Sequence, residues 1–265
     1  MDKYTEALDL WQSYHIASVA TLDKYLDSFR ILFAFHSGKL ENKEISYFKT
    51  REIFENGWVL NFTGNPRTLF EQQNQKLCYE VLKGKIIHKD RLSVEIIKEI
   101  HKVLTSGTYD ERQYIKNGER AGEFNKHDEV IGHDELGSSL ESIENDLTEL
   151  INEVNDYGGH DVLKVATYLH AKFQFIHPFA TGNGRVGRTL LNYYLMVNNH
   201  PPLIIYDEYK RFYYESLQKY DEDEELSALY KFLKFLVEKT WEKAIGLANN
   251  AKLDCNGLSD LKQNM

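Results

Sequence analysis

The sequence is poor in cysteine and proline and has no long apolar run. Its two cysteines, Cys78 and Cys255, lie far apart and form no paired motif, so neither a disulfide framework nor a thiolate metal site is expected. The N-terminus carries acidic residues among its apolar ones, and no run reaches the roughly eighteen apolar residues that suggest a membrane span. We therefore expect a cytoplasmic protein without membrane attachment.

An excess of basic charge is also missing. The net charge is −9, and 32 lysines and arginines are interspersed with 41 acidic residues. Binding to nucleic acid needs a basic stripe that neutralises phosphates, so a nucleic-acid partner is not expected. The ten histidines include no HExxH pair, which argues against a tight zinc site.

The scarcity of proline accompanies a strongly helical pattern. The four prolines are at positions 66, 178, 201 and 202, and apolar residues recur at spacings of three and four. This spacing predicts a mainly helical, all-α protein. The clearest helical segments are 22–40, 92–104, 140–154, 162–175, 185–197 and 226–247.

Glycines interrupt the helical pattern between residues 107 and 137. Within this segment, GEFNKHDEVIGH at 122–133 has two short extended pieces around a polar turn, which predicts a small β-hairpin. An irregular surface loop is an equally good interpretation of the same residues. The chain after residue 249 is predicted to be a loosely ordered tail.

The most informative segment is HPFATGNGRVGR at residues 177–188. An apolar helix leads to His177 and is stopped by Pro178, and the helical period restarts after the glycines. Gly182, Asn183 and Gly184 therefore lie at or just before a helix N-terminus, where free N–H groups and the helix dipole favour an anion.

Two arginines and one histidine complete this arrangement. Arg185 and Arg188 are one helical turn apart, so both guanidinium groups can reach one bound polyphosphate. His177 can accept a proton from an attacking hydroxyl while the phosphate is held in line. The segment predicts transfer of a phosphate-linked group to a hydroxyl.

The same segment resembles the signature of the Fic family, HPFx(D/E)GNGRxxR, at eight specified positions. The resemblance extends from about His101 to Tyr220 and implies a mainly helical Fic fold with a β-hairpin flap that docks the target protein. Glu123, Phe124, Val130 and Ile131 would belong to this flap. Most studied members transfer AMP from ATP to a Ser, Thr or Tyr hydroxyl of a protein.

The resemblance also implies a role for each matching residue. His177 would be the general base, and Phe179 a core anchor of the loop. Asn183 and the backbone of Gly182 and Gly184 would hold the α-phosphate, while Arg185 and Arg188 would contact the β- and γ-phosphates. Tyr206, Tyr209, Tyr213 and Tyr214 lie where the family builds its adenine pocket, although core packing is the simpler role for any one of them.

Thr181 is where this sequence departs from the family signature. Family members usually carry Asp or Glu there as a ligand of Mg²⁺, and a neutral hydroxyl binds a hard cation much more weakly. Three outcomes are open: Mg²⁺ or Mn²⁺ is held mainly by the nucleotide, another carboxylate substitutes, or the enzyme is slow or altered in substrate. Thr181 also suits an N-cap of the following helix.

A second motif of the family occurs near the N-terminus. Ser37, Glu41 and Asn42 match the inhibitory pattern (S/T)xxxE(G/N), and the first two lie on one helical face. The resemblance implies that Glu41 pairs with Arg188 and displaces the γ-phosphate. In some members the same glutamate supports removal of AMP, and this reverse activity stays open here.

These observations predict three regions and a principal function. Residues 1–98 form a helical region with the inhibitory helix, residues 99–248 form the Fic core, and residues 249–265 form the tail. The predicted function is protein adenylyltransferase, with ATP and a target protein as partners and self-modification in isolation. The alternatives are transfer of phosphate or another nucleotide, removal of AMP, or a catalytically weak binding module. The target protein and the oligomeric state, homo-oligomers included, are not encoded in the motifs.

Overall fold

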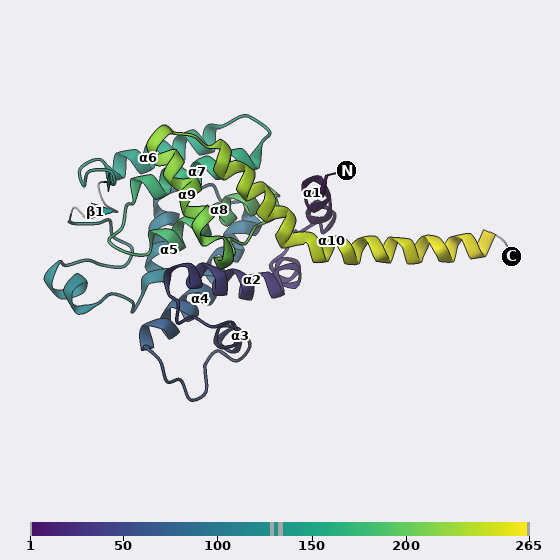
Figure 1. Ribbon diagram of the computed structural model, residues 1–265, viewed down its shortest axis with the longest axis horizontal. Helices are drawn as coiled ribbons and strands as arrows, with labels where there is room; N and C mark the ends of the chain where they lie inside the picture. Colours follow the sequence, from purple (N-terminus) through teal and green to yellow (C-terminus); the bar gives the residue numbers. More distant parts are fainter. Residues whose placement is uncertain (1, 128–129, 132–134, 264–265) are drawn as a thin grey trace.

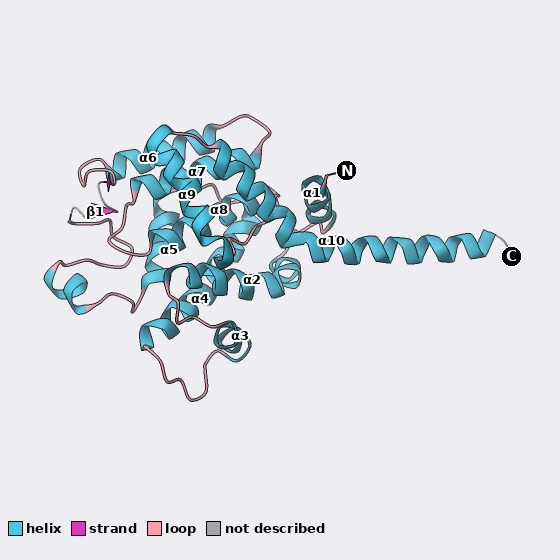
Figure 2. Cartoon of the chain, in the orientation of Figure 1, coloured by secondary structure: helices cyan, strands magenta, loops and turns pink. Residues whose placement is uncertain are grey.

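The computed structural model describes residues 2–127, 130–131 and 135–263. The chain is mainly helical, with one π-helical turn, η1, and one 3₁₀ turn, η2 (Figures 1 and 2). The helical elements in chain order are α1 (Lys3–Ser13), α2 (Val19–Glu41), α3 (Tyr47–Asn56), α4 (Pro66–His88), α5 (Val94–Thr105), η1 (Arg112–Lys116), α6 (Ile143–Asp156), α7 (Val162–Ile176), α8 (Asn183–Val197), η2 (Asp207–Tyr209), α9 (Lys210–Asp223) and α10 (Ser227–Gln263).

The predicted all-α fold class is confirmed. Each helical segment predicted from apolar spacing corresponds to a helix of the structure, namely α2, α5, α6, α7, α8 and α10. The helices α1, α3, α4 and α9 are not among the predicted segments. Among the described residues, no helix has both the length and the apolar character needed to cross a membrane.

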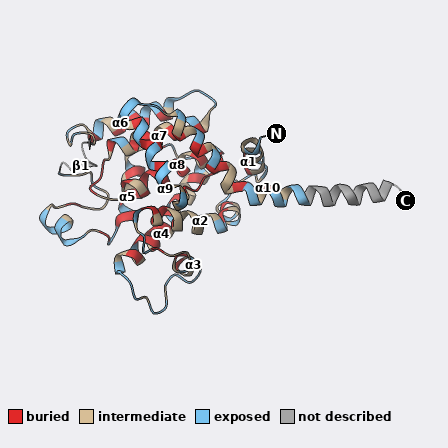
Figure 3. Ribbon diagram, viewed as in Figure 1, coloured by how far each residue is buried: buried red, intermediate tan, exposed pale blue. Residues whose placement is uncertain are grey.

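The centre of the fold is the pair α7 and α8, which pack on each other and carry buried residues over most of their length (Figure 3). Helix α5 packs on α8, and α9 and α10 pack on α7. One continuous cluster of buried apolar residues extends from Ala7 in α1 to Ile245 in α10. The predicted N-terminal region and the predicted Fic core therefore share one hydrophobic core.

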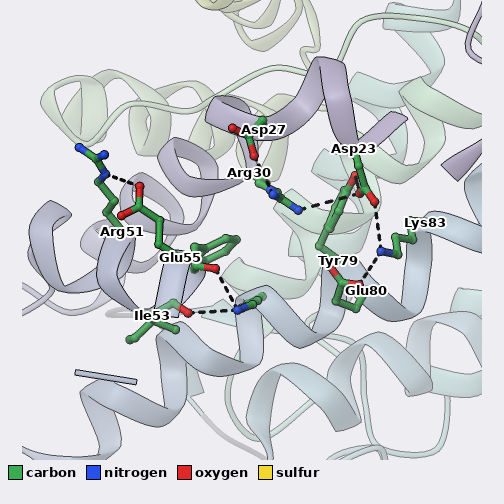
Figure 4. A network of polar contacts seen from close by, with 11 residues as sticks. Asp23, Asp27, Arg30, Arg51, Ile53, Glu55, Tyr79, Glu80 and Lys83 are labelled. Carbon is green, nitrogen blue, oxygen red and sulfur yellow. Dashed lines mark hydrogen bonds and ion pairs between the residues drawn. The ribbon is translucent and has the colours of Figure 1, made fainter. Parts of the chain in front are cut away.

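Helix α2 is attached to α4 by polar contacts (Figure 4). Tyr79 donates a hydrogen bond to Asp23 at 2.8 Å, and the Lys83 ammonium lies 3.2 Å from the other carboxylate oxygen of Asp23. Arg30 pairs with Asp27 at 2.7 Å within α2 itself. The contacts of Asp23 with Tyr79 and Lys83 therefore hold the N-terminal half of α2 against α4. The predicted inhibitory motif lies at the C-terminal end of α2.

The predicted β-hairpin differs from the structure in its bounds. The backbone pairs β1 (Val130–Ile131) with β2 (Glu135–Leu136) in antiparallel register, with Val130 opposite Leu136. Residues 122–127, the first half of the predicted hairpin, contain turns and bends and no strand, so a flap with the predicted strands is not seen. Residues 128–129 and 132–133 of the predicted hairpin lie outside the described residues.

The C-terminal segment has regular secondary structure. Helix α10 continues to Gln263, so the backbone predicted as a loosely ordered tail from residue 249 is helical. Figure 1 shows this end of α10 extending away from the other helices. The sequence hides this continuation because the segment has no apolar stripe comparable to those of the core helices.

Candidate active site

The predicted loop joins the two central helices. Helix α7 ends at Ile176, and His177 takes a left-handed conformation, with φ of 49°, while its N–H donates to Phe173 at 3.1 Å. Pro178 has no N–H to continue the helix. Helix α8 begins at Asn183, after Gly182 with φ of 85°. A loop of a few residues therefore connects two buried helices, which fixes both of its ends.

Asn183 closes this loop on itself. Its Oδ1 accepts from the N–H of Phe179 at 3.1 Å, and its Nδ2 donates to the Phe179 carbonyl at 2.6 Å. The same Nδ2 lies 3.2 Å from Nδ1 and 3.1 Å from Nε2 of His177. The amide assigned by resemblance to the α-phosphate is thus occupied in holding the loop and the imidazole.

The His177 ring is in the protonation state that a base requires. Burial lowers its pKa to about 4, although the Glu41 carboxylate opposes that effect. The imidazole is therefore neutral at pH 7 and has a nitrogen free to accept a proton.

A polar cavity of about 580 Å³ lies over the start of α8. No side chain caps the first turn of α8, so its N–H groups are available to an anion. Predicted and unpredicted residues share the walls, which consist of Glu41, Asn42, Lys43, Glu44, Arg67, Glu71, His177, Ala180, Thr181, Gly182, Asn183, Gly184 and Arg185. The volume is in the range of small-molecule sites.

The structure brings Glu41 and Arg188 together. Arg188 is buried, with a side chain only 2% exposed, and its Nη2 lies 2.8 Å from Oε1 of Glu41. The guanidinium also donates from Nε to the Ser37 hydroxyl at 3.0 Å and from Nη2 to the Ser37 carbonyl at 2.9 Å. Both predicted residues of the inhibitory motif therefore contact the second arginine of the loop motif.

The surroundings favour the ion pair of Glu41 and Arg188 both electrostatically and sterically. Burial would raise the pKa of Glu41, but Arg188 outweighs it and holds this pKa below its ordinary value. Lys210 donates to the Leu40 carbonyl at the end of α2. A Cβ atom on Gly184 would lie 2.3 Å from Oε1 of Glu41 and 3.0 Å from Nη1 of Arg188. The glycine at position 184 therefore makes room for the pair.

Arg185 lies deeper in the wall of the cavity. Its Nη1 donates to the Leu104 carbonyl at 3.2 Å, and the residue is only 4% exposed. Burial lowers the pKa of Arg185, and Glu71 opposes this effect. Among the described residues the hydrogen-bond partner of this guanidinium is that one carbonyl, which leaves donors for an anion in the cavity.

Thr181 lines the cavity but does not cap α8. The N-cap residue is Gly182, which offers no side chain, so the predicted capping role is wrong. The Thr181 carbonyl instead accepts a hydrogen bond from Nε2 of His101 at 3.1 Å. Because Gly182 follows in a left-handed conformation, α8 starts one residue later than a threonine cap would require.

The side chains of the cavity do not fit a resident divalent cation. Within 2–127, 130–131 and 135–263, no group of three His, Cys, Asp or Glu residues could hold a metal ion. Glu41 pairs with Arg188, and Glu71 lies 3.1 Å from Arg67 Nε. With a neutral Thr181 in place of a carboxylate, the protein alone offers too few oxygen ligands for Mg²⁺.

Both ends of the hairpin segment are tied to the loop beside His177. The N–H of Asn125 donates to the Pro178 carbonyl at 2.9 Å, and the N–H of Ser138 donates to the Ile176 carbonyl at 3.2 Å. Phe124, predicted in the flap, packs on Phe179 with ring centroids 5.8 Å apart. The segment that carries β1 and β2 therefore begins and ends next to His177.

The other flap residues and the predicted adenine tyrosines are less closely connected to the cavity. Glu123 pairs with Lys126 at 2.7 Å, and Val130 and Ile131 form β1. Tyr213 is 1% exposed, and its hydroxyl is hydrogen-bonded to Nε2 of His170 at 2.8 Å. The prediction that this residue contacts adenine directly is therefore wrong. Tyr206 and Tyr214 are more exposed and do not line the cavity, so their role stays a prediction.

Comparisons with known proteins agree with this geometry. Residues 91–195 match the model of the Fic/DOC family. Protein adenylyltransferase fic-1 of Caenorhabditis elegans is 26% identical over 213 residues, covering 77% of this chain and 39% of that protein. Protein adenylyltransferase Fic of Aedes aegypti is 27% identical and covers 78% and 39%, respectively. The chain thus spans about two fifths of the length of these curated relatives.

Solved structures show the same fold. A Fic-domain-containing signaling protein from Bacteroides thetaiotaomicron superimposes with a TM-score of 0.79 at 21% identity, covering 94% of this chain and 97% of the other. A segment of Fic-1 from C. elegans gives a TM-score of 0.77 at 22% identity, covering 94% and 72%. The loop motif, the fold around it and the match of residues 91–195 to the Fic/DOC model together support a Fic family protein.

Proposed function

We propose that this protein transfers AMP from ATP to a Ser, Thr or Tyr hydroxyl of a target protein. The proposal rests above all on one observation: a neutral His177 shares a cavity with the uncapped N-terminus of α8 and the buried Arg185. The relatives named protein adenylyltransferases support the same activity. A cytoplasmic location and a target protein as partner remain predictions from the sequence. The identity of that target and the formation of a homo-oligomer remain open.

The cavity can bind a triphosphate through its backbone and cations. The first N–H groups of α8 and the helix dipole favour an α-phosphate at the loop. Arg185 is held by the Leu104 carbonyl and faces the same space, where it would neutralise the β-phosphate. Arg188 would take the γ-phosphate once Glu41 no longer occupies it.

The chemical step needs only one proton transfer to the protein. His177 removes the proton from the target hydroxyl as its oxygen forms a bond to the α-phosphorus. The bond between the α-phosphorus and the bridging oxygen breaks, and pyrophosphate leaves with that electron pair. Asn183 keeps the imidazole in place during this step, since its amide contacts both ring nitrogens.

Magnesium enters this proposal with the substrate. Because the side chains around Thr181 do not form a cation site, we expect Mg²⁺ or Mn²⁺ to arrive bound to the triphosphate. The protein would then contribute at most a weak or water-mediated oxygen from Thr181.

The ion pair between Glu41 and Arg188 supports an autoinhibited resting state. It satisfies donors of Arg188 that the γ-phosphate needs, and its carboxylate lies over Gly184 at the start of α8. ATP would then bind with its α-phosphate turned away from in-line attack.

The test is the intact mass of the purified protein after incubation with ATP and Mg²⁺ or Mn²⁺. We expect Glu41→Gly to gain the mass of AMP faster than the wild type, on the order of tenfold or more, because Arg188 becomes free for the γ-phosphate. His177→Ala in the Glu41→Gly background should abolish the gain. Glu44→Gly is the matched control, since Glu44 lines the same cavity without contacting Arg188.

Each other outcome has a defined meaning. A gain of phosphate instead of AMP would replace the proposal by phosphate transfer. No mass change with either metal, in both wild type and Glu41→Gly, would favour a binding module. Equal rates for Glu41→Gly and Glu44→Gly would remove the inhibitory role of Glu41 and leave the transfer activity standing.

A further inference from the structure

His101 connects two parts of the site that are far apart in the sequence. It lies on α5, is completely buried, and contacts Thr181, which is 80 positions later in the chain. It also contacts Gly122, which precedes the hairpin segment. Neither the loop motif nor the inhibitory motif includes this residue.

The hydrogen bonds of His101 define one tautomer. The N–H of Gly122 donates to Nδ1 at 2.9 Å, so Nδ1 must be the unprotonated acceptor. The proton is then on Nε2, which donates to the Thr181 carbonyl at 3.1 Å. Burial lowers the pKa of His101 to about 3, so the ring stays neutral and keeps this tautomer at pH 7.

Packing holds the same ring in a fixed plane. His101 stacks on Phe179, with ring centroids 3.7 Å apart and planes inclined by 8°. Phe179 is the apolar anchor of the active-site loop and also packs on Phe124, with ring centroids 5.8 Å apart. The imidazole therefore touches the loop through its face as well as through Nε2.

Two glycines allow the backbone to approach α5 on both sides of His101. A Cβ on Gly122 would lie 3.0 Å from Cβ of Lys102, and a Cβ on Gly182 would lie 2.6 Å from Cγ2 of Thr105. Both glycines have left-handed φ values, 88° and 85°. Helix α5 is thus a common platform for the start of the hairpin segment and for the anion-binding turn.

We propose that His101 is a positioning residue that couples the target-docking segment to the phosphate-binding loop. One ring nitrogen fixes the backbone at Gly122, and the other fixes it at Thr181, so a hydroxyl docked on the hairpin and the α-phosphate keep one relative position. The inference rests on the proposed AMP transfer. It adds a residue outside the loop motif that acts through geometry, without touching ATP or the target.

The coupling predicts a selective kinetic defect. In the Glu41→Gly background, His101→Phe keeps the stacked ring and loses the hydrogen bonds to Gly122 and Thr181. It also loses the longer contacts of Nε2 with the hydroxyls of Thr105 and Tyr109, at 3.5 and 3.4 Å. We expect transfer of AMP to protein to fall on the order of 10- to 100-fold, with little change in KM for ATP, because small misplacement of reacting groups costs rate. Release of AMP by attack of water needs no docked protein and should fall much less.

Two further variants separate the two hydrogen bonds. The amide oxygen of His101→Asn can replace Nδ1 as acceptor for Gly122, whereas the amide of His101→Gln reaches further and can replace Nε2 as donor to Thr181. We expect His101→Asn to restore slow hydrogen exchange at the Gly122 amide and part of the rate of transfer to protein. In His101→Phe this amide should exchange faster than in Glu41→Gly alone.

The outcomes distinguish this inference from the proposed function. If Glu41→Gly with an intact His101 forms no AMP product, the proposed function fails. If it does, and His101→Phe transfers AMP to protein at an equal rate, the coupling is overturned. The coupling is also overturned if His101→Phe lowers the rates of AMP transfer to protein and to water by the same factor and lowers the melting temperature as well. Nitrogen NMR of the Glu41→Gly protein gives a check independent of the His101 substitutions: a proton on Nδ1 would contradict the assigned tautomer.

Discussion

At the residue scale, Thr181 is the position where the chain departs most from its family signature. Its carbonyl is held by His101, and its side chain is among the walls of the cavity. The backbone that would present an aspartate is therefore already fixed. What is missing is the charge, since a hydroxyl gives Mg²⁺ a neutral oxygen where a carboxylate would give an anionic one.

We expect Thr181→Asp to lower the Mg²⁺ concentration needed for half-maximal AMP transfer by about tenfold, or about 1.4 kcal/mol of binding free energy. The measurement is a Mg²⁺ titration of the rate at fixed ATP in the Glu41→Gly background. Thr181→Ser, which keeps a neutral hydroxyl, should leave the titration midpoint in place. An equal midpoint for Thr181→Asp would show that position 181 does not limit metal use.

The sequence predicts which residues belong to the site when those residues are close together in the chain. The spacing of His177, Gly182, Gly184 and Arg185 assigns them to one site, and all of them line one cavity. The Asn183 contacts with Phe179 escape prediction because a motif gives residue types without hydrogen-bond partners. Three other cavity residues lie outside both motifs, so the motifs do not predict them: Arg67 and Glu71 on α4, and Lys43 in the α2–α3 connection.

At the element scale, the position of α2 depends on its close approach to α4 near Gly38. A Cβ on Gly38 would lie 2.3 Å from Nε2 of Gln72 and 2.6 Å from Cδ1 of Ile45. Gln72 is itself held, because its Oε1 accepts from Thr50 at 3.0 Å. A larger residue at position 38 must therefore displace the ends of the Gln72 and Ile45 side chains, and we expect the end of α2 that carries Ser37 and Glu41 to move with them.

We expect Gly38→Ala to destabilise the fold by about 1–3 kcal/mol and to speed AMP transfer relative to the wild type. The displaced helix would weaken the pairing of Glu41 with Arg188, which supplies the second effect. Thermal unfolding and intact mass after incubation with ATP measure the two effects on the same preparation.

A glycine near the C-terminal end of α4 provides the matched control. A Cβ atom on Gly84 would meet no other atom within 4 Å, so Gly84→Ala should stabilise its helix by about 0.5–1 kcal/mol and leave transfer unchanged. If Gly38→Ala loses stability yet transfers AMP no faster than the wild type, the position of α2 does not set the inhibition.

Apolar spacing does not predict two helices near the site, α4 and α9, and the physical reason is the same for both. Helix α4 buries Glu71, Gln72, Asn74 and Gln75, so its inward face is polar and its apolar period is weak. Helix α9 alternates charges with tyrosines and buries few of its residues. Periodicity detects a helix only when the buried face is apolar, and α4 buries polar groups because they bond to neighbouring elements, as Asn74 does to the Leu104 carbonyl.

At the scale of the whole molecule, the first helix, α1, and the N-terminal part of the last helix, α10, pack together in the same core. Helix α1 packs on α10, and Trp11 meets Trp241 with ring centroids 5.3 Å apart. The predicted inhibitory helix α2 contacts both α4 and α8 within this core. The predicted inhibitory motif is therefore part of the folded unit. Under the proposed function, releasing Arg188 would need only a local change at Glu41.

Buried neutral histidines make the stability of this unit sensitive to acid. The pKa is lowered to about 3 for His101 and to about 4 for His170 and His200, in each case mainly by burial. In the unfolded chain these groups have a pKa near 6.5, so between pH 6.5 and 4 the unfolded state binds more protons than the folded state. Stability must then fall as the pH falls through this window.

By pH 5 each of these histidines should cost about 2 kcal/mol of unfolding free energy, since one pKa unit corresponds to about 1.4 kcal/mol. We expect the melting temperature of the wild type to drop by at least about 5 °C between pH 7 and pH 5, measured by circular dichroism at constant ionic strength. His160 is exposed, so His160→Asn should reproduce the wild-type profile. A melting temperature that stays constant over this range would mean that the folded chain takes up as many protons as the unfolded chain, which contradicts the lowered pKa values of the buried rings.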